Sequence, residues 1–262
     1  MTMKAIMALV FLLATLAATS QAKSIPYQIY PLRLRSGSAG QDVAGASCLS
    51  WRFGVETHNI RDWDLVPEEC GDYIGHYMLG DQFLKDCNVT AYEAYEYAQN
   101  LTLANDGKDI WVFDIDDTAL SNLPYYARSD VAFGTIPYNE TKFDEWIAKG
   151  KMPPMPSVLW LYKKLVTLGF KIVFLSGSSE SYREVRISNL ENAGYETWEK
   201  LMLKNTSDSG LTAIAYKSKR RTELVEEGYR ILGNMGDQWS DLLGENIGNR
   251  TFKVPDPMYY IA

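Results

Sequence analysis

The sequence contains few histidines and cysteines, and acidic residues outnumber basic ones. Two histidines and three cysteines occur among 262 residues. Neither His58 nor His76 has a partner at metal-ligand spacing, so a zinc site is unsupported and we expect both to be structural. No cysteine stands with a histidine in a suggestive motif, which argues against thiol catalysis. With a net charge of −7 and no basic stripe, the chain is a poor candidate for nucleic-acid binding.

Long hydrophobic runs are absent after the N-terminus. Lys4 precedes an almost wholly apolar run over residues 5–18, and Ser20-Gln21-Ala22 places small residues where a signal peptidase cleaves. Since a membrane span needs about 20 apolar residues, a cleaved signal peptide over residues 1–22 is favoured over a membrane anchor. Its removal takes away Lys4 and no acid, which moves the net charge from −7 to −8. We expect a secretory-pathway protein, extracellular or vacuolar, without membrane contact after cleavage.

Secretion permits disulfides and glycans. Cys48 and Cys70 flank one compact segment and are the favoured pair. Cys87 is then either buried or available to link two chains. Five sequons are candidate glycosylation sites, at Asn88, Asn100, Asn139, Asn205 and Asn249.

The pattern of the chain changes near residue 109. Residues 23–108 predict an irregular arm and then a helical extension, with helices over 67–83 and 90–104. After this point short apolar runs alternate with amphipathic helices. The expected strands are 110–113, 171–175, 201–203, 229–232 and 250–254, and the expected helices are 157–168, 181–193 and 217–227. Such alternation predicts an α/β fold with a Rossmann-like parallel sheet and helices on both faces, over residues 109–262.

An aromatic-rich insert over residues 122–156 interrupts this core after its first strand. We interpret it as a small cap over a site. An ordinary surface loop packed by its own aromatic residues remains the alternative.

Polar residues follow three of the expected strands. Asp114 and Asp116 follow the first, Ser176 the second, and Asp237 another, with Asp241 four residues further on. Ligands of parallel sheets bind beyond the carboxyl ends of the strands, so these side chains are expected around one pocket. Carboxylates with substrate phosphate suit Mg²⁺. Lys217, expected at a helix start, adds a positive charge, and the whole set suits phosphoryl transfer through an aspartyl-phosphate.

These motifs resemble those of the haloacid-dehalogenase superfamily of phosphatases. Asp-x-Asp-x-Thr stands at residues 114–118, a serine after an apolar strand is Ser176, a lysine is Lys217, and Gly-Asp-x-x-x-Asp stands at residues 236–241. A narrower resemblance, to the plant acid phosphatase (class B) and vegetative storage protein family, extends from about Cys48 to Tyr260. It includes "SWRFGVETHNIRDWDLVPEEC", "YKSKRR", "GNMGDQWSDL" and "PDPMYY".

The resemblance implies roles for individual residues. Asp114 would be the nucleophile and Asp116 the general acid/base. Thr118, Ser176, Gly177 and Lys217 would form the phosphate-binding side, with Thr118 also bracing the loop. Mg²⁺ would be bound by Asp114, the main-chain carbonyl of Asp116, Asp237 and, directly or through water, Asp241. Asp117 is expected to have a structural role at a helix start.

One position departs from the family pattern. Relatives commonly carry Gly-Arg after the phosphate-binding hydroxyl, whereas this chain has Gly177-Ser178.

The expected function is a Mg²⁺-dependent acid phosphatase acting on phosphate monoesters. The main alternative is a vegetative storage protein on the same scaffold with weak or incidental activity. A defence or binding role through a homodimer is a weaker alternative.

Overall fold

The computed structural model describes residues 47–261. The expected signal peptide over residues 1–22 and the whole irregular arm expected after it lie outside the described residues. The elements before the sheet are α2 (Cys48–Glu56), η1 (Glu68–Cys70), α3 (Gly71–Leu79) and α4 (Asp81–Gln99). The strands are β1 (Asp109–Phe113), β2 (Lys171–Ser179), β3 (Lys200–Lys204), β4 (Arg230–Gly236) and β5 (Thr251–Lys253). The elements between and after them are α5 (Leu123–Tyr126), η2 (Ala132–Gly134), α6 (Glu140–Ile147), α7 (Pro156–Leu168), η3 (Glu180–Tyr182), α8 (Arg183–Asn192), η4 (Thr206–Asp208), α9 (Ala213–Glu226) and α10 (Trp239–Leu242).

The five strands form one parallel sheet in the order β3-β2-β1-β4-β5. The connections between strands return the chain to the same end of the sheet before each new strand, as parallel pairing requires. In this order β1 is the central strand, between β2 and β4. Phe113, its last residue, pairs in register with Phe174 of β2 and Met235 of β4. The predicted parallel α/β sheet is confirmed.

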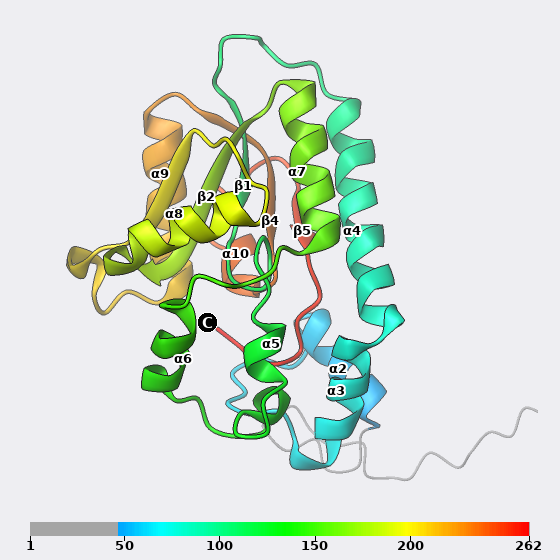
Figure 1. Cartoon of the computed structure of the whole chain (residues 1–262). Coiled ribbons are helices and arrows are strands. Elements are labelled where there is room, and N and C mark those ends of the chain that lie inside the picture. Colours follow the sequence, from blue (N-terminus) through cyan, green and yellow to red (C-terminus); the bar gives the residue numbers. More distant parts are fainter. Residues whose placement is uncertain (1–46, 262) are drawn as a thin grey trace, which may run out of the picture. The chain divides into compact units, whose positions relative to one another are not determined.

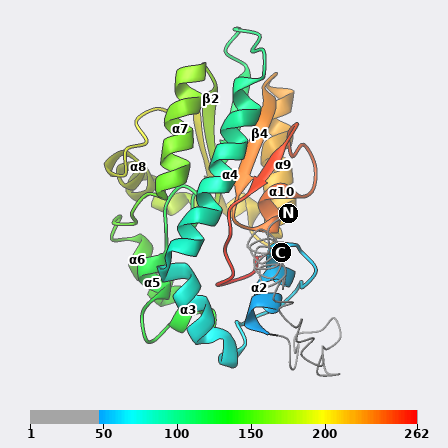
Figure 2. The same cartoon turned by 90° about the vertical axis from the view of Figure 1, so that its right-hand side faces the viewer.

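Helices cover both faces of this sheet. Alternate residues of β1 point to opposite faces, so Trp111 and Phe113 pack into the core beneath α4 and α7. Ile110 and Val112 pack on the other face with Tyr216 of α9. Figures 1 and 2 show α4 and α7 side by side on one face of the sheet and α9 on the other. All five residues of β1 are buried, as a central strand with two covered faces demands.

The helical extension before the sheet differs from its predicted boundaries. The helix predicted over residues 67–83 is divided at Gly80, and α4 then runs through the start of the helix predicted over residues 90–104. A side chain at Gly80 would place its Cβ 2.6 Å from the carbonyl oxygen of His76 in α3, so the glycine lets the chain leave α3 with an extended backbone. Cys48 and Cys70 form a disulfide between α2 and η1, and Cys87 is buried and free. No helix within residues 47–261 is long and apolar enough to span a membrane.

The insert over residues 122–156 and the C-terminal segment lie at the carboxyl ends of the strands. The insert contains α5, η2 and α6. After β5 the chain runs back toward α5 (Figure 1), and Tyr259 stacks on Tyr126 of α5 with ring centroids 5.3 Å apart. Two segments that are more than a hundred residues apart in sequence thus face the same edge of the sheet.

Candidate active site

Polar residues at the carboxyl ends of three neighbouring strands lie together. Asp114 follows β1, Ser176 lies in β2, and Asp237 follows β4. The backbone N–H of Asp114 donates to the carbonyl oxygen of Met235 at 2.9 Å, which continues the pairing past the end of β1. β2 and β4 both extend beyond their predicted ends, because parallel pairing with their neighbours continues there. The expected convergence of these residues at one sheet edge is what the structure shows.

A group of three buried carboxylates lies at this edge. One oxygen each of Asp114, Asp237 and Asp241 can be chosen so that all three lie within 4.8 Å of one another. Lys217 forms ion pairs with Asp114, at 2.7 Å, and with Asp241. It lies one turn inside α9 rather than at the helix start that the sequence predicted. Lys217 therefore pairs with two of the three acids, and the group is short of positive charge.

Short contacts fix this three-carboxylate group. The backbone N–H of Gln238 donates to Asp241 Oδ2 at 3.0 Å. Gly236 is packed against Asp241, and a Cβ at that glycine would lie 2.3 Å from Asp241 atoms. Thr118 Oγ1 donates to Asp237 Oδ1 at 3.0 Å and is fully buried. Thr118 thus braces Asp237 and is not among the residues that line the cavity described below, while its expected part in phosphate binding stays a prediction.

The side chain of Asp116 lies apart from that group. Ser176 Oγ donates to its Oδ2 at 3.3 Å, and Asn122 Nδ2 donates to its Oδ1 at 3.2 Å. Arg186 Nη2 donates to both oxygens, at 2.9 and 2.8 Å. The carboxylate of Asp116 is therefore not among the three that face one another, and its proposed role as a metal ligand would involve only its main-chain carbonyl.

The third acid of the first motif shapes the loop. Asp117 has a left-handed φ of 56°, which is unusual for a residue other than glycine, and it is buried. Its carboxylate accepts hydrogen bonds from the backbone N–H and side-chain amide of Asn122, at 2.8 and 3.0 Å. Asn122 in turn is the N-cap of α5. Asp117 thus has a structural role, although it lies in a turn before α5 and not at a helix start.

Burial and crowding change the acidity of these groups. Burial raises the pKa of Asp114 well above its usual value, Lys217 opposes this shift, and the nearby carboxylates add to it. Burial and the charge of Asp241 raise the pKa of Asp237 to about 6. Burial also acts to lower the pKa of Lys217, but the charges of Asp114 and Asp241 outweigh it, so that its pKa is raised and the lysine stays cationic. These shifts indicate negative charge that the protein does not fully compensate.

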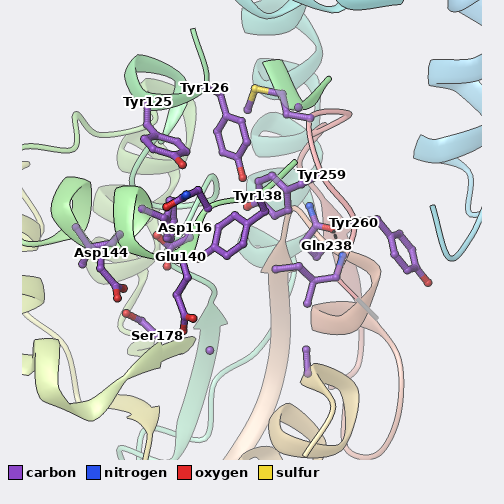
Figure 3. A pocket seen from close by; sticks show the side chains of 18 of the residues that line it. Asp116, Tyr125, Tyr126, Tyr138, Glu140, Asp144, Ser178, Gln238, Tyr259 and Tyr260 are labelled. Atoms are coloured by element: carbon purple, nitrogen blue, oxygen red, sulfur yellow. Dashed lines mark hydrogen bonds between the residues drawn. The ribbon is translucent and has the colours of Figure 1, made fainter. Parts of the chain in front are cut away.

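A cavity of about 850 Å³ lies over the strand ends. Asp114, Asp116, Ser176, Gly177 and Lys217 line it on the sheet side. Aromatic side chains of the insert and the C-terminal segment line it elsewhere, among them Tyr125, Tyr126, Tyr138, Phe143, Tyr259 and Tyr260. Figure 3 shows the rings of Tyr125, Tyr126 and Tyr138 near Asp116, with Ser178 on the side away from Tyr125 and Tyr126. The insert therefore contributes a wall of the pocket, as a cap would.

The site geometry agrees with the comparisons to known proteins. Residues 34–262 match the family model described as HAD superfamily, subfamily IIIB (Acid phosphatase). The chain belongs to this family.

Its relatives carry both enzyme and storage-protein names. "Acid phosphatase 1" of Solanum lycopersicum is 49% identical over 82% of this chain and 83% of the relative. "Stem 28 kDa glycoprotein" of Glycine max is 45% identical over 97% and 98% of the two chains. "Vegetative storage protein 2" of Arabidopsis thaliana is 42% identical over 82% and 81%. The resemblance proposed from the motifs is confirmed.

A solved structure supports the fold. The class C acid phosphatase from Bacillus anthracis has a TM-score of 0.57 to this chain, at 22% sequence identity, over 72% of this chain and 85% of that one. At this identity the likeness concerns the fold alone. The haloacid-dehalogenase-like fold class is thereby confirmed for this family member.

Four residues of this HAD-family site were not found from the sequence. Tyr259 Oη donates to Asp117 and to Asp237, at 3.1 Å in both cases, and Gln238 Nε2 bridges Asp237 and Asp256. Asp256 and Tyr259 belong to the "PDPMYY" stretch, which signalled family membership but not a place in the site. Arg186 lies on the buried face of α8 with Leu190 four residues later. A charged residue at an apolar helical position was the available signal.

Proposed function

We propose that this protein is a Mg²⁺-dependent acid phosphatase that hydrolyses phosphate monoesters through an aspartyl-phosphate. The observation that carries the proposal is Asp114 at the cavity floor, paired with Lys217 and backed by Asp237 and Asp241. A carboxylate in this position can attack a phosphorus atom, and the surrounding charges can stabilise the transferring group. The acid phosphatase family and the relative named "Acid phosphatase 1" support the reaction class.

In the proposed mechanism the reaction takes place as two successive displacements at phosphorus, and the residues that line the cavity take part in both. In the first, an oxygen of Asp114 bonds to phosphorus while the bond from phosphorus to the ester oxygen breaks, and Asp116 gives a proton to the leaving alcohol. In the second, Asp116 takes a proton from water, the water oxygen bonds to phosphorus, and Asp114 is released with inorganic phosphate. Ser176 and Gly177 lie at the cavity wall, where a hydroxyl and backbone N–H groups can donate to phosphate oxygens.

The donor set fits a hard divalent cation. Asp114, Asp237 and Asp241 offer three carboxylate oxygens within 4.8 Å of one another, and Mg²⁺ prefers oxygen ligands and binds through one or two carboxylates with substrate phosphate. Among residues 47–261, Lys217 is the one cation that forms ion pairs with Asp114 and Asp241, so a bound metal ion would relieve the repulsion among the three acids. When bound, Mg²⁺ supplies positive charge against the phosphate oxygens. The main-chain carbonyl of Asp116 is the proposed further ligand.

The proposal includes a secretory protein that carries glycans. The Cys48–Cys70 disulfide fits an oxidising compartment, and the soybean relatives are named glycoproteins. The five sequon asparagines, Asn88, Asn100, Asn139, Asn205 and Asn249, are all exposed. An extracellular or vacuolar location follows. A mass decrease on enzymatic deglycosylation of the protein purified from its source tests this part.

The decisive experiment is hydrolysis of p-nitrophenyl phosphate, measured between about pH 4.5 and 7 with Mg²⁺ and with a chelator. We expect turnover that the chelator removes and Mg²⁺ restores. Asp114→Asn should abolish it, since an amide is a poor nucleophile. Turnover that survives this substitution would contradict the aspartyl-phosphate mechanism.

A storage protein with incidental phosphatase activity is the second candidate. It is favoured by relatives named vegetative storage protein and stem glycoprotein, at 42% and 45% identity. Storage depends on abundance, so the test is the amount of protein in tissue under nitrogen surplus. Levels that stay low through such a surplus would argue against this candidate.

A further inference from the structure

The turn after the phosphate-binding serine carries no positive charge in this chain. Its residues are Gly177, Ser178 and Ser179. The cations that line the cavity are Lys142, Lys204, Lys217 and Arg186. Lys142 pairs with Asp130 of the insert, and Lys204 donates to the carbonyl oxygen of Leu211. Arg186 is the one of these four with a side-chain contact to the turn within residues 47–261.

Arg186 reaches the turn from the following helix. Its Nε and Nη2 donate to Ser178 Oγ at 3.1 and 3.0 Å, and the same Nη2 donates to both oxygens of Asp116 at 2.9 and 2.8 Å. The arginine therefore joins the turn to the carboxylate that is expected to exchange protons with the substrate.

The rest of the side chain is tightly enclosed. Nη1 contacts Met152 Sδ at 3.2 Å. Met152 is itself fixed by Asn189 of the same helix, which accepts from its backbone N–H at 3.0 Å and donates to its carbonyl at 2.8 Å. The side chain of Arg186 is only 2% exposed. Each of its three guanidinium nitrogens thus already has a partner within the protein.

We propose that Arg186 is a positioning residue that orients Asp116, supplying from α8 the charge that the turn lacks at Ser178. This inference rests on the proposed phosphatase function. An arginine in the turn itself would be exposed to the cavity and could touch the phosphate directly. Arg186, whose nitrogens are all engaged, acts through Asp116. Displacement of a reacting group by about 1 Å can slow a reaction about 10²-fold, so this orientation matters to turnover.

The two roles that a buried arginine could have give opposite kinetic results. If Arg186 orients Asp116, its loss lowers kcat and leaves the binding of substrate and of inorganic phosphate nearly intact. If Arg186 binds the phosphate, its loss raises KM and the inhibition constant of inorganic phosphate. The structure favours the first result, because Asp116 and Ser178 occupy its donors.

The test compares Arg186→Met with wild type, using p-nitrophenyl phosphate with Mg²⁺ and inorganic phosphate as inhibitor. Methionine keeps most of the apolar volume and removes the donors. We expect kcat to fall about 10²-fold, with KM and the phosphate inhibition constant within about threefold of wild type. Arg186→Lys should recover part of kcat, since an ammonium can still donate to Asp116. Unchanged kcat, or a rise in both constants at constant kcat, overturns the inference.

A matched control lies on the same helix. Arg183 pairs with Glu180 and donates to the carbonyl oxygen of Leu201 at 3.0 Å, and it does not line the cavity. Arg183→Met should leave kcat and KM unchanged. Stabilisation of Arg186→Met against thermal unfolding by added phosphate shows that the variant is folded and its phosphate site intact.

A structural readout separates this inference from the proposed function. Absence of turnover in wild type contradicts the phosphatase proposal. The crystal structure of Arg186→Met then still decides the positioning role. An Asp116 carboxylate that has left its place beside Ser176 supports the inference, and one that has not moved contradicts it.

Discussion

Asp114 and Asp116 are two residues apart in the chain but lie in opposite charge environments. Asp114 shares Lys217 with Asp241 and lies beside Asp237, which leaves an excess of negative charge. Among residues 47–261, Arg186 is the one ion-pair partner of Asp116, so one positive charge stands against this carboxylate. The first environment favours a bound cation, and the second favours a carboxylate fixed in one orientation. One short motif thus provides two chemically different groups because the chain turns immediately after β1.

The largest effect is expected from removing the lysine of the first environment. Lys217→Met leaves buried Asp114 and Asp241 without their cation, and breaking a buried ion pair typically costs about 3–5 kcal/mol of unfolding free energy. Loss of its charge should also reduce turnover about 10³-fold. Chemical denaturation and steady-state kinetics measure the two effects.

A neighbouring lysine of α9 serves as the control. Lys219 is half exposed and pairs with Asp208, which keeps Arg220 as a second partner. Lys219→Met should cost less than about 1 kcal/mol and leave turnover unchanged. Equal effects of the two substitutions would show that Lys217 has no special role.

A smaller effect is expected from crowding the same environment. The Cβ of Gly236→Ala would lie 2.3 Å from atoms of Asp241, so that carboxylate has to move. Overpacking of this kind costs about 1–3 kcal/mol, and we expect weaker Mg²⁺ binding with it. Thermal unfolding and a Mg²⁺ titration of activity provide the measurements. Gly177→Ala meets no atom within 4 Å and should leave folding stability unchanged. Tight Mg²⁺ binding by Gly236→Ala would contradict the placement of Asp241 at the metal.

The buried carboxylates near Asp114 should make the unfolding free energy depend on pH. Burial raises the pKa of Asp117 to about 8 and of Asp237 to about 6, both above the value of about 3.9 in an unfolded chain. The folded protein then binds more protons than the unfolded one, so unfolding free energy falls as pH rises from about 4 to about 8. Denaturation with a chelator at several pH values tests this. Added Mg²⁺ should oppose the fall, because a cation favours the ionised acids; identical profiles with and without Mg²⁺ would argue against metal binding.

The smallest effect is expected from removing the hydroxyl of Tyr259, which contacts Asp117 and Asp237. Tyr259→Phe removes the donor shared by Asp117 and Asp237, which should cost about 1 kcal/mol and weaken Mg²⁺ binding slightly. Tyr97→Phe is the control, since Tyr97 Oη donates at 3.0 Å to the carbonyl oxygen of Leu232, within β4. It should cost a similar unfolding free energy without changing Mg²⁺ binding. A Tyr259→Phe variant that matches Tyr97→Phe in both measurements would remove Tyr259 from the site.

Much of the fold could be predicted because its signals are local. Short apolar runs, amphipathic helices and stops such as Gly169, which has a left-handed φ of 98°, follow from neighbouring residues. Helix boundaries in the extension were less accurate, because the backbone becomes extended at Gly80 and ends α3 inside the helix predicted over residues 67–83. β2 and β4 were predicted too short, since pairing with neighbouring strands extends them beyond their apolar residues.

The sequence by itself determined the parallel sheet, the family and the candidate site residues Asp114, Asp116, Ser176, Lys217 and Asp237. These follow from the spacing of the motifs and from the alternation of strands and helices along the chain. Only the tertiary structure decided which charges face one another. It paired Lys217 with two acids, buried Thr118 beneath Asp237, and brought Arg186 to Asp116 from 70 residues away. Such pairings depend on how α8, α9 and the C-terminal segment pack on the sheet edge, and packing is a property of the whole chain.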